Sequence, residues 1–275
     1  MRMRSSIVPA ALLGLTLLSY PVWASAAGGA VPQDPSKAQN QSYITQTGEM
    51  ARCEVEQTGR SNLSHVYQDK GAALAQVYQD GQFLESEVQQ RGLGQPANTT
   101  KIQQDGQGHY ANVLQDGQAN NADIRQRGMA HSSFGETGKN HAGITQHGLS
   151  NDAQIEQSGW GQLASITQGS DPYLGIGNKA TIRQIVGSGN LASICQLGEG
   201  NQAAINQTVS GGEASISQTG SGNKATLNQS VAGLMASIIQ KGDQNSVTLN
   251  HNFPNAVTVT QTGFQAVAEI TISKK

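Results

Sequence analysis

The chain has 275 residues; aromatic residues make up 4% of them and charged residues 13%, whereas Gly occupies 33 positions. A composition this poor in aromatic side chains does not suit a conventional globular core and is typical of disordered or repetitive chains. The net charge of −2 gives no electrostatic reason to expect nucleic acid or an anionic membrane as a partner.

Residues 1–26 are predicted to be a secretory signal peptide. Arg2 and Arg4 precede an apolar run over 7–23, and the small residues at 24–26 form a cleavage site. The run is short for a membrane-spanning helix, although an uncleaved anchor is the alternative interpretation. We therefore expect a mature, secreted chain that begins at residue 27.

From about residue 42 onward the chain repeats with a period close to 11 residues. A Gln, here called the marker, closes most units, and filling the gaps in register with Glu136, His251 and Ile272 gives 21 units. The residue two places before the marker is apolar in all 21 units, whereas a 36% hydrophobic composition gives about eight by chance. The residue four places before the marker is small in nearly every unit.

Each unit is predicted to form a short β-strand with one face turned inward. The small, apolar and marker positions alternate with mostly polar ones, and this period of two fits a strand and excludes a helix. Gly often follows two places after the marker, where it permits a tight turn. The predicted core residues of the most regular units are Ile182, Ile194, Ile205, Ile216, Leu227 and Ile238.

Proline marks the predicted interruptions, because it cannot donate to a ladder of strand hydrogen bonds. Pro96 and Pro172 lie in insertions near 93–97 and 170–174. The insertions divide the repeat region, 42–275, into predicted blocks at 42–92, 98–169 and 175–275.

The predicted fold class is all-β, a two-sheet parallel β-solenoid of about 21 short strands in about ten 22-residue turns. Apolar residues would fill a thin core, while Gln and Asn at successive turns would form hydrogen-bonded amide ladders. The ladder residues of the most regular units are predicted to be Gln184, Asn190, Gln196, Asn201, Gln207, Gln218, Asn223, Gln229 and Gln240. The end strands, near 42–46 and 266–272, would remain open templates, so the array should grow by adding further copies.

Two stretches resemble the curlin repeat Q-x-G-x-G-N-x-A-x3-Q. They run over 196–207 and 218–229, and the resemblance is strong from about 175 to 250 and looser back to 42. It implies a subunit of curli, the extracellular amyloid fibre that serves adhesion and biofilm formation on Gram-negative bacteria. Ala-Ser-Ile-x-Gln runs such as 192–196 resemble the minor, nucleating subunit more than the major one, although the last unit lacks Gln.

The same resemblance implies the partners of the chain. These are further copies of itself and other curlin subunits, periplasmic chaperones, and an outer-membrane secretion channel. Residues 27–41, which contain Pro32 and Pro35, stand where the family has an unstructured segment that the channel reads.

We predict no catalytic residues, no cofactor and no metal site. Cys53 falls at an inward position and Cys195 at an outward one, twelve units apart. The repeat would separate them by roughly 29 Å, far beyond the roughly 7 Å that a disulfide allows. His109 occupies an Asn place and His251 a marker place, so both are interpreted as ladder substitutions rather than metal ligands.

Charged residues just after the markers should line the edges of the array. The predicted successions are Asp69, Arg91 and Asp116 on one edge, and Asp80, Asp105 and Arg127 on the other. We interpret these charges as solvating the edges and limiting lateral aggregation. The alternative functions are a secreted monomeric β-solenoid adhesin or a polysaccharide-acting enzyme, which would show a flat Thr-x-Thr array or a recurring acid cluster.

Overall fold

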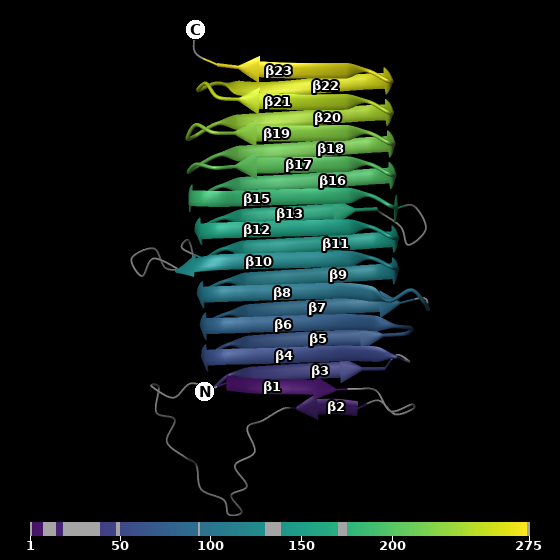
Figure 1. The fold of residues 1–275 in the computed structure, drawn as a ribbon, viewed down its shortest axis with the longest axis vertical. Helices are drawn as coiled ribbons and strands as arrows, with labels where there is room; N and C mark the ends of the chain where they lie inside the picture. The colour runs from purple at the N-terminus through teal and green to yellow at the C-terminus, as the bar shows by residue number, and fades with distance from the viewer. Residues whose placement is uncertain are drawn as a thin grey trace, which may run out of the picture.

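The structure is a computed structural model that describes residues 2–7, 15–18, 39–47, 50–92, 94–129, 139–169 and 175–273. All its regular elements in these ranges are β-strands. Figure 1 shows them as one tall stack in which successive strands alternate between two layers. The predicted fold class, a two-sheet parallel β-solenoid of about ten turns, is confirmed.

Ten repeat units supply the strands of one layer, called sheet A. They are β4 (Ala51–Arg60), β6 (Ala73–Gln82), β8 (Asn98–Gln107), β10 (Asn121–Met129), β12 (Asp152–Trp160), β15 (Lys179–Ser188), β17 (Gln202–Gln207), β19 (Lys224–Gln229), β21 (Ser246–His251) and β23 (Val267–Ile272).

The other ten units supply sheet B. They are β3 (Gln41–Gln46), β5 (Leu63–Asp69), β7 (Glu85–Gly92), β9 (Tyr110–Gln118), β11 (His141–Leu149), β13 (Leu163–Gln168), β16 (Leu191–Glu199), β18 (Glu213–Ser221), β20 (Met235–Asp243) and β22 (Ala256–Phe264). A short strand, β14 (Gly175–Ile176), joins the same sheet between β11 and β16.

Two strands of the predicted signal peptide lie at the N-terminal end of the stack. β1 (Arg2–Ile7) pairs antiparallel with β4, and β2 (Leu15–Leu18) pairs antiparallel with β3. All the pairs between repeat strands are parallel. In the whole chain, the N-terminal edges of both sheets are therefore covered by strands from outside the repeat.

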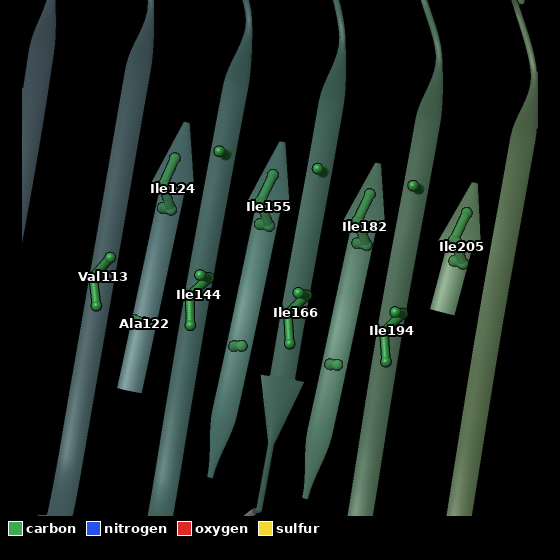
Figure 2. Close-up of a cluster of buried hydrophobic side chains, with 14 of the residues drawn as sticks. Val113, Ala122, Ile124, Ile144, Ile155, Ile166, Ile182, Ile194 and Ile205 are labelled. Atoms are coloured by element: carbon green, nitrogen blue, oxygen red, sulfur yellow. The ribbon is translucent and has the colours of Figure 1, made fainter. Parts of the chain in front are cut away.

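The repeat register determines which residues stack. Equivalent positions pair from turn to turn, so that Ile155 lies opposite Ile182, and Ile182 opposite Ile205. Figure 2 shows one row formed by Ile124, Ile155, Ile182 and Ile205 beside a second row from the other sheet. All six predicted core residues are buried, at 2% exposure or less. Burial of each such side chain contributes about 2 kcal/mol.

The predicted strand around Phe134, with Glu136 as its marker, falls at 130–138, outside the described residues. Strand β9 pairs directly with β11, and β10 directly with β12. The described ranges therefore contain 20 repeat strands, ten in each sheet.

The predicted insertions do not interrupt the stack. Strand β6 pairs with β8 and β7 with β9 across residues 93–97. Strand β13 pairs with β16, and β12 with β15, across 170–174, which lie outside the described residues. The three blocks proposed from the sequence would therefore be segments of one continuous solenoid.

The turn glycines allow neighbouring turns to approach closely. Gly220 has φ +115°, and a Cβ placed on it would lie 2.1 Å from the carbonyl oxygen of Gly242 in the next turn. Both the backbone conformation and the contact therefore require Gly. Gly143 differs, because its φ is ordinary and a Cβ there meets nothing within 4 Å.

Replacing Gly220 with Ala should lower the free energy of unfolding by more than about 1 kcal/mol, because the turn must move away from Gly242. Denaturant unfolding followed by circular dichroism measures the change. Gly143→Ala is the matched control and should leave the midpoint unchanged or raise it slightly. Equal midpoints for the two variants would contradict the proposed role of the turn glycine.

Candidate functional site

Sheet B contains an unbroken ladder of ten buried or half-buried glutamines that runs the whole length of the stack. Each side-chain Nε2 donates to the Oε1 of the next Gln, over 2.6–2.9 Å. The ladder consists of Gln46, Gln68, Gln90, Gln115, Gln146, Gln168, Gln196, Gln218, Gln240 and Gln261. Its hydrogen bonds all run in one direction, with the donor on the N-terminal side.

A second hydrogen bond from the same amide joins the two sheets. Gln196 Nε2 donates to the backbone oxygen of Lys179 at 3.0 Å, and Gln218 Nε2 does so to Gln202 at 3.0 Å. Both N–H groups of the buried amide are thereby satisfied, which removes the large cost of burying an unpaired polar group. Each marker thus connects the turns to one another and closes the end of the core.

The corresponding ladder in sheet A is shorter. Its Nε2 to Oε1 distances are 2.7–2.9 Å. The ladder consists of Gln57, Gln79, Gln104, Gln126, Gln157, Gln184, Gln207 and Gln229. The next two places in the column are His251 and Ile272. Sheet A therefore reaches the C-terminal edge of the stack without a marker amide.

The asparagines form a different kind of ladder at the turns. The backbone N–H of Asn223 donates to Asn201 Oδ1 at 3.0 Å, and Asn223 Nδ2 donates to the carbonyl oxygen of Gly242 at 2.6 Å. Asn201 repeats this geometry with Asn178 and Gly220. Asn190 Oδ1 accepts from the backbone of Gly212 at 2.9 Å. These side chains hold the tight turns in register.

The structure separates the nine predicted ladder residues into distinct groups. All nine are buried at 1% exposure or less. The glutamine ladder of sheet A contains Gln184, Gln207 and Gln229. The glutamine ladder of sheet B contains Gln196, Gln218 and Gln240. Asn201 and Asn223 stack at one turn, and Asn190 lies at another.

Sequence reasoning missed the amide bond across the two sheets, because a repeat period contains no information about contacts to the opposite layer. It also missed Thr100, which stands where most units have Ala. Its hydroxyl donates to Gln115 Oε1 at 2.9 Å and accepts from Gln90 Nε2 at 3.1 Å. A buried polar residue in the small column was the signal that could have revealed it.

Replacing Gln207 with Leu should lower the free energy of unfolding by about 1–3 kcal/mol, because the buried amides of Gln184 and Gln229 each lose a partner. Denaturant unfolding measures this loss. Gln202→Leu is the matched control on the same strand, where the side chain is exposed, and should change stability by less than about 0.5 kcal/mol. Equal effects at the two positions would contradict a structural role for the ladder.

The two ladder histidines are buried. His109 Nε2 lies 2.9 Å from the carbonyl oxygen of Gly128 and 3.2 Å from that of Asp105. Burial lowers the pKa of His109 from 6.5, and the two carbonyl contacts only partly offset this effect. His251 Nε2 contacts Asn255 Oδ1 at 2.6 Å. Both histidines thus take up turn or ladder contacts.

The lowered pKa of His109 predicts a stability that decreases in acid. Below about pH 6.5 His109 binds a proton more readily in the unfolded chain than in the folded chain. The free energy of unfolding therefore decreases by at most about 1.4 kcal/mol for each unit by which the pH falls. His109→Asn removes the titration and keeps a side-chain amide at this turn. Unfolding measured at pH 7.5 and pH 5 should show a smaller loss for the variant; an equal loss would contradict the prediction.

The two cysteines lie in different sheets and are both free. Cys53, in β4, is completely buried, and burial is the main cause that raises its pKa to about 12, with Glu54 adding to the effect. Cys195, in β16, is half-exposed on the outer face, and partial burial raises its pKa too. Neither thiol is activated as a nucleophile.

The charged successions form as expected at the strand ends. Asp69 lies opposite Arg91 and Arg91 opposite Asp116 in sheet B. In sheet A, Asp80 lies opposite Asp105 and Asp105 opposite Arg127. Across the described ranges, no group of three His, Cys, Asp or Glu side chains is placed to hold a metal ion.

A comparison with known protein families matches residues 96–128 to the curlin associated repeat. This stretch contains β8 and β9 together with most of β10, and therefore markers of both ladders. The match supports the resemblance to curlins that the repeat motif indicated. No curated protein matches the chain. Among its described residues, no helix has the length and apolar character needed to cross a membrane.

Proposed function

We propose that this chain is a curlin, a structural subunit of an extracellular amyloid fibre that assembles by stacking solenoids end to end. The observation that supports this most directly is the ladder of sheet B, which runs from Gln46 at one end of the repeat to Gln261 at the other. A ladder of this kind leaves an acceptor at one edge and a donor at the other. A second copy can satisfy both.

The leader strands fit a route in which export precedes assembly. β1 and β2 occupy the edges of β4 and β3, and both lie within the proposed signal peptide, residues 1–26. Removal of this segment would expose both N-terminal edges. Residues 27–41 would then serve as the secretion-targeting segment read by an outer-membrane channel, with periplasmic chaperones keeping the chain unassembled before export.

At the cell surface the fibre would serve biofilm matrix and adhesion, with other curlin subunits as partners. The family match supports this structural role in preference to catalysis. The preference for the minor, nucleating subunit stays a prediction from sequence. A monomeric solenoid adhesin or polysaccharide-acting enzyme is the alternative that experiment must separate from a fibre subunit.

The chain at residues 27–275 should convert to fibres after a lag phase and give a meridional reflection near 4.7 Å. Dye-binding kinetics and fibre diffraction measure this conversion. The chain that retains residues 1–26 is the control and should elongate more slowly, because β1 and β2 block the N-terminal edges. A persistent monomer from 27–275 would contradict the fibre function and favour the monomeric alternatives.

A further inference from the structure

The two ends of the solenoid differ in how well they would receive a second copy, a point that rests on the proposed fibre function. Since the stack has ten repeat strands in each sheet, a copy added at the C-terminal end places its β3 on β22 and its β4 on β23. Sheet B then continues as sheet B, and sheet A as sheet A. The register within the chain identifies the residues that meet at this junction.

The sheet B half of the junction is well matched. Val259, the core residue of β22, would stack on Ile44 of the added copy. Gln261 would present its amide N–H to Gln46, whose own amide already donates onward to Gln68. The ladder therefore passes from one copy to the next with the same direction of hydrogen bonding.

The sheet A half of the junction is mismatched inside the core. Ile272 takes the marker place of β23, directly after His251 in the column. The added copy brings Gln57 to this place, and the amide of Gln57 already donates onward to Gln79 at 2.7 Å. Ile272 cannot donate to the oxygen that remains, so docking would bury an acceptor without a partner.

The same half of the junction is mismatched on the outer face. Glu269 is exposed on β23 and would lie directly opposite Glu54 of the added copy. Like charges in directly opposed positions on parallel strands repel. The diagonal neighbours of Glu269 would be Arg52 and Glu56, one charge of each sign, so they largely offset one another.

We propose that the C-terminal edge of sheet A is a selective docking surface that disfavours a second copy of this chain. This edge fits a solenoid whose first sheet A strand carries an apolar residue in the marker column and no acid in the Glu54 column. The N-terminal edge accepts an amide donor in both sheets, through Gln46 and Gln57. It therefore fits a different curlin solenoid that ends in Gln in both sheets better than it fits a second copy of this chain.

Repairing the mismatch tests this proposal. The double substitution Glu269→Thr and Ile272→Gln in the chain 27–275 supplies the missing donor and removes the like charge. Thr matches Thr226 and Thr248, which precede it in the column. Seeded elongation, with each chain growing from its own seeds, should be about fivefold faster or more for the repaired chain. The matched control is Thr271→Gln, an outward position on the same strand, which should elongate like the unmodified chain.

Glu269→Thr alone keeps the test independent of any folding defect from a polar residue at 272, and it should also speed elongation. If the unmodified chain forms fibres and neither repaired chain elongates faster, the selective edge is wrong while the fibre function stands. If neither the unmodified nor the repaired chain forms fibres, the fibre function is wrong and the selective edge falls with it.

Discussion

The buried side-chain amide of the marker glutamine is the interaction on which the rest of the structure depends. Its two N–H groups are satisfied only when another turn lies above it and a strand of the opposite sheet lies beside it, as for Gln218 with Gln240 and Gln202. An amide buried without these partners would cost about 1–3 kcal/mol for each unpaired group. The ladder is therefore complete only within a stack, which is the physical basis for the proposed assembly.

Much of this fold could be predicted from the sequence, because the decisive pattern is local. Alternation of an apolar residue such as Ile194 with polar neighbours determines which face turns inward, and the repeated spacing determines which residues pair. Ile166, Ile194 and Ile216 accordingly stack in register. The structure adds the division of the ladders into two sheets and the bonds between those sheets, which involve residues far apart in any single unit.

The pairing of β9 with β11 shows where local pattern stops being informative. The repeat places a unit around Phe134 between these two strands in the sequence, yet the strands pair directly. Whether a unit enters a stack depends on pairing with the strands above and below, and no pattern within 11 residues reports on that. His251 and Ile272 occupy marker places, as the repeat predicted, and they end the amide column of sheet A.

The even number of repeat strands has a consequence for how such a protein can vary. Residues 93–97 and 170–174 lie between strands that pair across them, so insertions there change the length of the chain and leave the phase of the two layers intact. If the chain lost or gained one 11-residue strand, sheet A of one molecule would have to continue as sheet B of the next. Every second molecule would then be rotated by half a revolution about the long axis. A gain or loss of 22 residues would leave each sheet continuous from one molecule to the next. The complete turn, rather than the single strand, is therefore the unit in which this architecture can lengthen or shorten without disturbing a polymer built from it.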